Sequence, residues 1–537
     1  MFSLKQAARW AVAGMAGYAL LAAGAAVAAT PNTKTSTADH SKFSQLKGPF
    51  PDGPSVTRAC LDCHNDAASQ IHKTKHWTWD VVNPATGRNL GKKNIINNFC
   101  GTIQSNEPRC TSCHIGYGWK DGNFDFASKE NVDCVVCHDT TNTYRKFPVS
   151  AGHPLYKPTE WPKGSGRIIP PPDLAKIAQG VGKTTRNTCG VCHFNGGGAN
   201  AVKHGDLDQS LINPPKFLDV HMSPDRLDFS CSSCHGGDAH AIQGSRYSTI
   251  AKDMSGIDVV GRTDGSRATC ESCHGTTPHK DTANPKLNDH TDVLACPTCH
   301  VPEFARGGTA TKMWWDWSTA GRLNEKGKPL TVHDEKTGYE LYSGMKGDFK
   351  WGEFVQPEYR WYNGTVKYTL LGDEVTGDQV VKINTFEGGP DDPDARIWPF
   401  KVMRGKQPYD KGNKTLALVH TFGNDDSAYW GNYDWPKAIA AGMKSAGKDF
   451  SGEYGFVQTE MAWPITHMVA PKEDAVACVA CHSADSRLKG VPGLYIPGLS
   501  RFWGGWLDML FWLAALGSLA GVLGHGALRY YMSKKEG

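Results

Sequence analysis

Residues 110–114 read Cys-Thr-Ser-Cys-His, and the pattern Cys-x-x-Cys-His recurs along the chain. The sequence holds eight copies, which use sixteen of its seventeen cysteines. A chain of 537 residues with this cysteine and histidine content would contain about 0.02 copies by chance. The copies are Cys60/Cys63/His64, Cys110/Cys113/His114, Cys134/Cys137/His138, Cys189/Cys192/His193, Cys231/Cys234/His235, Cys270/Cys273/His274, Cys296/Cys299/His300 and Cys478/Cys481/His482. We expect the fold to be organised around this repeat.

The spacing of the motif has a chemical reason. Two thiols three residues apart can each form a thioether with one vinyl group of a single porphyrin, and the histidine that follows then lies beneath the iron as its proximal ligand. Zinc sites and redox dithiols use one or two Cys-x-x-Cys units and do not place a histidine after every one. The sequence therefore predicts eight covalently bound haem c groups, each held by two motif cysteines and one motif histidine.

The N-terminus has the pattern of a secretory signal. Lys5 and Arg9 precede an apolar stretch at residues 11–21, and Ala26-Val27-Ala28 is typical of a signal peptidase site. We expect residues 1–28 to be a cleaved signal peptide, with an uncleaved anchor as the alternative. Export agrees with the motifs, because thioethers would consume the thiols in an oxidising compartment.

The C-terminus predicts a membrane anchor. Residues 509–528 contain no charge and are long enough to cross a bilayer core as a helix. Aromatic residues flank this run, and Arg529, Lys534 and Lys535 follow it, which places the C-terminus in the cytoplasm. The aromatic residues are Trp503, Trp506, Trp512, Tyr530 and Tyr531. Residues 499–537 are thus expected to anchor a haem domain on the periplasmic side of the bacterial inner membrane.

The remaining segments suggest one haem domain before the anchor. Residues 29–55 are polar and predict a flexible arm, residues 56–300 hold seven motifs, and residues 301–498 form an aromatic cover region that ends with the eighth motif. We expect a mainly α fold with much irregular structure. Residues 365–371 alternate as a strand does, and Asp434 is placed to cap a helix that ends before Gly447.

Composition limits the possible partners. The formal charge of +4 omits the propionates that eight haems would bring, so the field of the holoprotein cannot be derived from it. No basic cluster with interleaved aromatic residues is present, and we therefore expect no nucleic-acid partner.

Thirteen histidines lie outside the motifs. His40 lies in the polar arm and His525 in the anchor, so we set both aside as ligands to these haems. Electron-transfer haems are usually six-coordinate, and most of the other eleven are therefore candidate distal ligands. These are His72, His76, His153, His204, His221, His240, His279, His290, His333, His420 and His467.

Several runs resemble the octahaem tetrathionate reductase family. They are residues 76–79, 95–100, 109–121, 130–141, 187–208 and 294–317, and the similarity spans Cys60 to His482 with all eight motifs in order. The resemblance implies seven bis-histidine haems and one catalytic haem whose distal ligand is a lysine. That lysine follows a glycine-rich run in the family, which corresponds here to Gly196-Gly197-Gly198 and Lys203.

The resemblance also implies further site residues. A cysteine lies near the catalytic haem in the family, and Cys100 is the only cysteine outside the motifs. A buried inert thiol is the alternative for Cys100. The family has an aspartate where this chain has Asn200, which puts an acid role there in doubt. We assign the catalytic haem to the Cys110 motif, next to Cys100 in sequence.

Seven distal histidines then suffice for the other haems. We assign His76, His204, His221, His240, His279, His290 and His467, with His153 and His420 as replacements. His72 and His333 are expected to be solvated.

The resemblance implies multi-electron reduction of a small sulfur or nitrogen oxo species, namely tetrathionate, nitrite or hydroxylamine. Two alternatives stay open, an electron conduit without its own substrate and a dehydrogenase of the hydroxylamine type. Pentahaem nitrite reductases fit less well, because their catalytic lysine replaces a motif histidine and all eight motifs here keep histidine. We expect the anchor to dock on a membrane cytochrome b or another quinol-oxidising subunit, with His525 either packing against it or binding haem there.

Overall fold

The computed structural model describes residues 38–263, 265–496 and 506–535, with side chains of the last segment from Met509 onward. The predicted signal peptide, Trp503 and the start of the anchor lie outside these residues. The described α-helices are α2 (Gly53–Leu61), α3 (Ala67–Ile71), α4 (Lys75–Thr78), α5 (Glu107–Cys110), α6 (Val135–His138), α7 (Leu174–Gln179), α8 (Arg186–His193), α9 (Glu271–His274), α10 (Leu287–Thr291), α11 (Cys296–His300), α12 (Tyr429–Asn432), α13 (Trp435–Ser445) and α15 (Trp506–Lys535).

Most of these helices are one or two turns long, because the motifs and their connecting loops leave little periodic sequence. Local capping fixes where the longer ones begin. The Asp52 carboxylate accepts a hydrogen bond from the Ser55 backbone N–H at 2.8 Å at the start of α2. Thr185 and Thr188 form a capping box at the start of α8, which carries the fourth motif. The described residues also form short 3-10 turns, some of which carry motif cysteines or candidate histidine ligands. These turns are η1 (His40–Lys42), η2 (Ser44–Leu46), η3 (Thr111–Cys113), η4 (Gln209–Ile212), η5 (Cys231–Ser233), η6 (Asp238–His240), η7 (Trp317–Thr319), η8 (Lys472–Asp474) and η9 (Cys478–Ala480).

The region between the seventh and eighth motifs corrects the expectation of a mainly α fold. It forms a nine-stranded sheet of order β11-β15-β13-β5-β8-β7-β6, with β9 and β14 also paired to β13. Its strands are β5 (Thr311–Asp316), β6 (Thr331–His333), β7 (Glu340–Ser343), β8 (Gly347–Gly352), β9 (Glu358–Tyr362), β11 (Val381–Lys382), β13 (Arg396–Asp410), β14 (Thr415–Leu416) and β15 (Tyr454–Pro464). Three two-stranded ribbons pair β1 (Val81–Val82) with β2 (Asn89–Leu90), β3 (Thr159–Glu160) with β4 (Ile168–Ile169), and β10 (Val366–Tyr368) with β12 (Asn384–Phe386).

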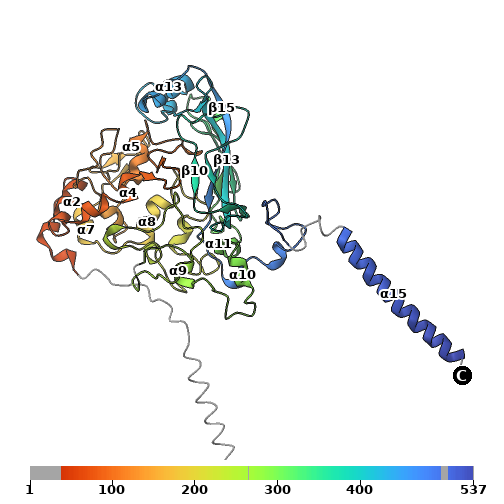
Figure 1. Cartoon of the computed structure of the whole chain (residues 1–537). Helices are drawn as coiled ribbons and strands as arrows, with labels where there is room; N and C mark the ends of the chain where they lie inside the picture. The colour runs from red at the N-terminus through yellow and green to blue at the C-terminus, as the bar shows by residue number, and fades with distance from the viewer. Residues whose placement is uncertain (1–37, 264, 497–505, 536–537) are drawn as a thin grey trace, which may run out of the picture.

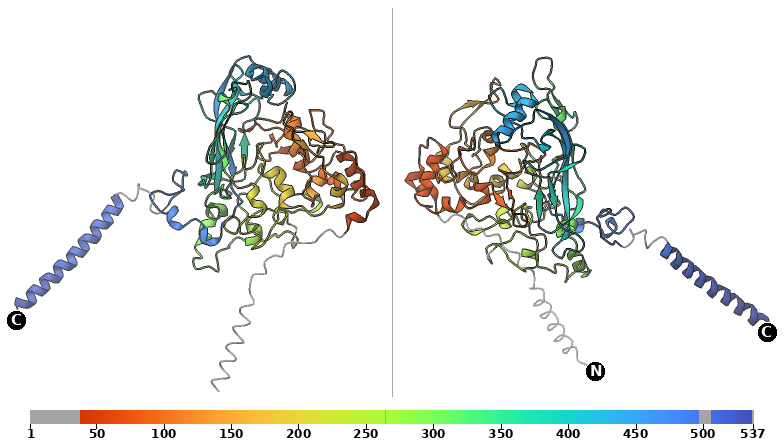
Figure 2. Two further views of the ribbon diagram at one scale, coloured as in Figure 1. Left: turned by 180° about the vertical axis from the view of Figure 1, so that it is seen from behind. Right: turned by 45° about the horizontal axis from the view of Figure 1, so that its top comes forward.

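The sheet stands as a slab along one side of the short helices (Figure 1). Both views of Figure 2 show the same arrangement, with α13 at one end of the sheet. Strands β13 and β15 pair antiparallel from Phe400 opposite Pro464 to Asp410 opposite Tyr454, while β5 pairs parallel to β13. Buried Trp315, Met403 and Trp463 belong to the largest hydrophobic cluster. The sheet is therefore the rigid wall against which the motif-bearing loops pack.

Two local predictions agree with the structure. Asp434 accepts a hydrogen bond from the Lys437 backbone N–H at 3.0 Å, and α13 ends at Ser445 before Gly447. The alternating run at residues 365–371 contains β10. At the C-terminus, α15 includes the predicted span, and residues 509–535 are apolar and long enough to cross a membrane, with their side chains exposed.

Candidate haem-binding sites

A single cavity of about 5140 Å³ runs among the short helices and the loops that connect them. Ordinary ligand pockets measure about 300–1,000 Å³. All sixteen motif cysteines line this cavity, together with every motif histidine except His114. Its size and its lining are those of a chamber for several large planar groups.

Seven pairs of imidazole rings cross this cavity, and each pair joins one motif histidine to one histidine from elsewhere. Two metal–nitrogen bonds of about 2.0–2.1 Å place the centroids of two opposed imidazole rings roughly 6.3 Å apart. The observed centroid distances are 6.3 Å for His40–His64, 6.0 Å for His76–His193, 6.3 Å for His138–His240, 6.0 Å for His221–His274, 6.2 Å for His235–His467, 6.3 Å for His279–His300 and 6.2 Å for His290–His482. The residues present thus fit seven bis-histidine irons.

Hydrogen bonds to the second ring nitrogen orient several of these imidazoles. His138 Nδ1 donates to the Gly182 carbonyl at 2.8 Å, and His235 Nδ1 donates to the Gln243 carbonyl at 3.0 Å. His467 Nδ1 donates to the Asp206 carboxylate at 3.1 Å. Burial lowers the pKa of His467, but the hydrogen bond to Asp206 and the negative charges of Asp206 and Asp219 together outweigh burial, so the pKa is raised. Metal-bound histidines are normally held in this way, with Nε2 left for the metal.

The pairs include six of the seven predicted distal histidines and replace the seventh. His76, His221, His240, His279, His290 and His467 each lie beside a motif histidine. His204 does not: its ring lies 6.2 Å from Trp463, and its Nδ1 lies 3.9 Å from Asp206. His40, which the sequence had excluded, takes the remaining place beside His64.

His40 reaches the cavity because its segment is not a free arm. Asp39 caps η1, and buried Leu46 packs into the same hydrophobic cluster as Leu174 of α7. The Gln179 side chain also donates to the Leu46 carbonyl at 3.2 Å. Residues 38–46 are therefore fixed against a helix far along the chain.

The four other histidines have different partners. His153 Nδ1 bonds Tyr156 Oη at 2.7 Å, and His420 bonds the Ser105 carbonyl and Asp425. His72 stacks on Trp77 at 4.6 Å, so it is not simply solvated, whereas His333 on β6 is exposed as expected.

Replacing His40 by methionine is expected to change the spectrum of one low-spin haem and to raise its reduction potential, because a thioether ligand favours ferrous iron relative to imidazole. His204→Met, the matched variant, is expected to leave the low-spin haem set unchanged. Magnetic circular dichroism and redox titration of both holoproteins measure this. An altered low-spin haem in His204→Met together with an unaltered set in His40→Met would restore His204 as the ligand.

His114 of the second motif differs from the other motif histidines. Its Nε2 donates to the Trp77 carbonyl at 2.7 Å, and its ring lies edge-on to Trp79 and Trp119 at centroid distances of 5.2 and 4.9 Å. In this rotamer His114 is therefore not positioned as the proximal ligand that the sequence predicts. Ligation by His114 requires its ring to exchange the Trp77 hydrogen bond for the metal.

Lys203 lines the cavity near this second motif. Its backbone N–H donates to the Gly196 carbonyl at 3.2 Å, which closes the loop after α8. From the sheet, Lys401 Nζ on β13 donates to the Val202 and Lys203 carbonyls at 3.0 and 2.9 Å. Burial lowers the pKa of Lys203 well below its usual range, and the charges of Arg246 and other nearby cations lower it further. This shift favours the neutral amine, which is the form that can donate a lone pair.

Of the two other predicted site residues, Cys100 lines the cavity and Asn200 does not. Cys100 lines the cavity and its thiol donates to the Gly197 carbonyl at 3.4 Å, while burial raises its pKa and keeps it protonated. Gly197 has φ +83°, and a Cβ there would lie 2.7 Å from Val202, so the run needs glycine at this point. The Asn200 side chain instead accepts a hydrogen bond from the Gln209 backbone N–H at 3.0 Å, and Asn200 does not line the cavity. We therefore withdraw Asn200 as a catalytic candidate.

Comparison with solved structures places this geometry in a family. The chain matches an octahaem cytochrome c from Shewanella oneidensis with 43% identity and a TM-score of 0.73, covering 85% of this chain and 97% of that one. The chain belongs to the octahaem cytochrome c family. Two family descriptions also match, "Cytochrome c bacterial" over residues 312–485 and "Cytochrome c554 and c-prime" over residues 59–139. No curated protein matches the chain. Membership confirms the resemblance found in the sequence and makes the chain a multihaem electron-transport protein with covalent haem c.

Cysteines of neighbouring motifs meet in this octahaem cytochrome c and link the motifs into a series. Four pairs of thiols from different motifs lie close enough to shift each other's pKa, namely Cys60 and Cys134, Cys113 and Cys192, Cys189 and Cys231, and Cys270 and Cys296. Cys234 also lies near Cys273, and Cys299 lies near Cys481. As thioether sulfurs, these atoms would hold the edges of adjacent porphyrins. The motif at Cys478 is thus linked through those at Cys296, Cys270, Cys231 and Cys189 to the one at Cys110.

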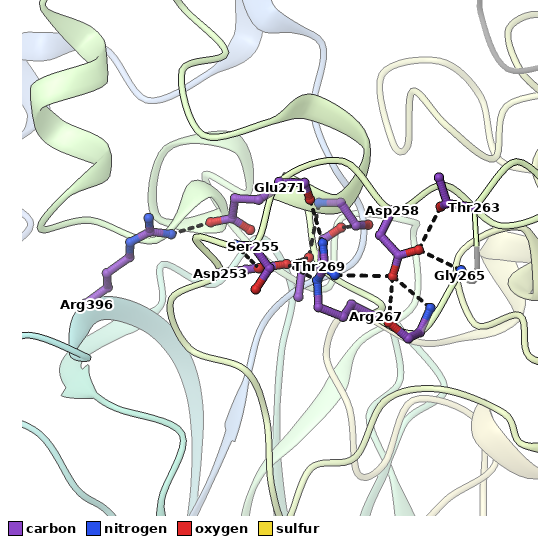
Figure 3. A network of polar contacts seen from close by, with 12 residues as sticks. Asp253, Ser255, Asp258, Thr263, Gly265, Arg267, Thr269, Glu271 and Arg396 are labelled. Atoms are coloured by element: carbon purple, nitrogen blue, oxygen red, sulfur yellow. Dashed lines mark hydrogen bonds and ion pairs between the residues drawn. The ribbon is translucent and has the colours of Figure 1, made fainter.

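A polar network fixes the sixth motif in this octahaem cytochrome c (Figure 3). Arg267 Nε donates to Asp253 at 2.8 Å, and Asp258 accepts from the Gly265 backbone N–H at 2.6 Å. Glu271, inside the motif, forms an ion pair with Arg396 at the start of β13. Sequence analysis did not identify Arg396, because no local pattern pairs residues 125 positions apart.

Proposed function

We propose that this octahaem cytochrome c is a reductase that carries eight haems and reduces tetrathionate, or nitrite and hydroxylamine, at a lysine-ligated haem on the Cys110 motif. The asymmetry among the motif histidines carries the proposal. Seven of the eight motif histidines have an imidazole across the cavity, whereas the Cys110 motif has the half-buried Lys203 near Cys113 instead. A lysine amine would be displaced from iron more easily than an imidazole of a bis-histidine pair, so one iron would be available to substrate.

The chain's residues have distinct tasks in this function. When bound, haem supplies electron storage and a Lewis-acidic iron. Cys110 and Cys113 would hold the catalytic haem, His114 would join them once its ring leaves the Trp77 carbonyl, and Lys203 would supply the exchangeable ligand. The Lys401 hydrogen bonds fix the backbone from which Lys203 extends. Reduction of tetrathionate takes up two electrons, breaks the central S–S bond and releases two thiosulfate ions without a proton.

The order of the motifs supports delivery of electrons from the membrane end. The Cys478 motif is the last before α15, and the cysteine contacts connect it stepwise to the Cys110 motif. We infer that the haem domain lies on the periplasmic side of the inner membrane and that α15 docks it on a cytochrome b or another quinol-oxidising subunit. His525 lies within α15, where it packs against that subunit.

Ligand-difference spectroscopy followed by turnover tests the proposal. Added cyanide is expected to perturb one haem of eight, and a reduced dye is expected to support turnover of tetrathionate, nitrite or hydroxylamine. Eight low-spin haems that ignore cyanide, without turnover, would identify an electron conduit instead. Faster oxidation of hydroxylamine with an oxidised dye than any reduction would identify a dehydrogenase.

A further inference from the structure

Arg246 is a half-buried arginine whose charge has no carboxylate counterpart among the residues that the structure describes. Its side chain lines the cavity, and its Nη1 is buried without a hydrogen-bond partner. Among residues 38–263 and 265–496, the groups that act on its pKa are Tyr247 and Tyr368, and neither is a carboxylate. A buried charge is costly unless an opposite charge or hydrogen bonds compensate it. The guanidinium is therefore suited to an anion that is not part of the polypeptide.

The position of the Arg246 guanidinium is fixed by its neighbour. Its Cζ lies 4.7 Å from the centre of the Tyr247 ring, and its Nη2 donates to Tyr247 Oη at 2.5 Å. Tyr247 is itself buried and lies 5.7 Å from Tyr368 of β10. Tyr247 thus occupies one face of the guanidinium and its Nη2, which leaves Nη1 to bind a ligand.

The cavity wall around Lys203 is cationic. Arg246, Lys92 and Lys203 all line the same cavity. Tyr247 belongs to the same hydrophobic cluster as Val202, the residue before Lys203. The nearest carboxylate on this loop, Asp206, is engaged by His467. An anion entering beside Lys203 would thus meet a field that attracts it.

We propose that the Arg246 guanidinium binds the oxygens of an anionic substrate beside Lys203, and that the active centre thereby selects oxyanions over neutral substrates. The proposal rests on the proposed function and adds the determinant of its substrate class. Two N–H groups of a guanidinium match two oxygens of nitrite or of a sulfonate end of tetrathionate. A propionate of a bound porphyrin is the competing partner for the same charge.

Steady-state kinetics of the Arg246→Gln holoenzyme tests the proposal through substrate charge. The KM for tetrathionate and for nitrite is expected to rise about tenfold to a hundredfold, since one charged hydrogen-bonding group is lost. The KM for hydroxylamine, which is neutral at mildly alkaline pH, is expected to stay within about twofold of the wild-type value. Arg246→Lys should recover part of the loss because it keeps the charge without the fork. Arg167→Gln, at an exposed arginine, is the matched control.

Binding of thiosulfate to the oxidised holoprotein, measured by calorimetry, gives a readout without turnover. Arg246→Gln is expected to weaken this binding about tenfold or more while every haem potential stays unchanged. Equal losses for all three substrates together with a shifted haem potential would assign Arg246 to a propionate and overturn the proposal. So would thiosulfate binding that is indifferent to the substitution. Absence of turnover in the wild type would instead refute the proposed function, and thiosulfate binding would still test Arg246.

Discussion

Lys203→Ala is expected to leave every haem attached, to open one iron to added ligands and to lower tetrathionate turnover on the order of a hundredfold. The expectation follows from the position of Lys203 in the cavity and from the lowered pKa of its amine, which favours the form that can bind a metal. Without this side chain the distal position loses its resting ligand, and substrate loses a group that orders its approach. Haem content by pyridine haemochrome, cyanide difference spectra and dye-driven assays measure the three effects.

Lys336→Ala is the matched control, because Lys336 is exposed in the turn between β6 and β7. It should behave as wild type in all three measurements. If the wild-type protein has eight bis-histidine irons, and if turnover is indifferent to Lys203→Ala, then Lys203 is a structural lysine of the glycine-rich loop and the catalytic site lies elsewhere.

The attachment motifs could be predicted from the sequence because each is complete within five residues. Six of the seven histidines predicted as distal ligands do lie opposite a motif histidine, because they lie on loops close to the motifs and few other histidines competed for the role. His40 could not be predicted, since its burial depends on Leu46 packing near α7, more than a hundred residues away. The polar composition of the segment indicated a solvent-exposed arm, but its contacts with α7 hold it against the domain. His204, in contrast, does not lie opposite a motif histidine, because its ring packs on Trp463 of β15.

The large sheet was missed for a different reason. Residues 396–403 of β13 are all buried, so the strand has no alternation between a polar and an apolar face. Lys401, in the middle of this run, is fully buried and would ordinarily indicate an exposed position. It is buried because its Nζ donates hydrogen bonds to the carbonyls of Val202 and Lys203, and the second of these contacts spans 198 residues in sequence. In contrast, α13 could be predicted, because Asp434 and Pro436 mark its start locally.

The anchor leads to the second large expected effect. Deleting all residues after Gly498 is expected to leave dye-driven activity at the wild-type level and to reduce quinol-driven activity to background. The haem domain keeps its contacts in the truncated chain, because Ile496 and Leu488 pack with Trp361 and Ile397 in one buried cluster. The His290–His482 pair is likewise retained. The deletion removes α15, whose exposed apolar side chains would otherwise face lipid or a membrane partner.

A full-length His525→Leu variant separates the two roles of this helix. It keeps a helix that can span the membrane and removes its one imidazole. Quinol-driven activity in membranes is expected to stay near the wild-type level if α15 acts by docking, because a leucine fills the helix surface at least as well in lipid. Loss of quinol-driven activity in His525→Leu, with the protein still in the membrane, would show that the imidazole takes part in electron entry. Quinol-driven reduction that survives truncation after Gly498 would remove the anchor from the electron path altogether, and electrons would then have to enter at a haem that is exposed on the soluble domain.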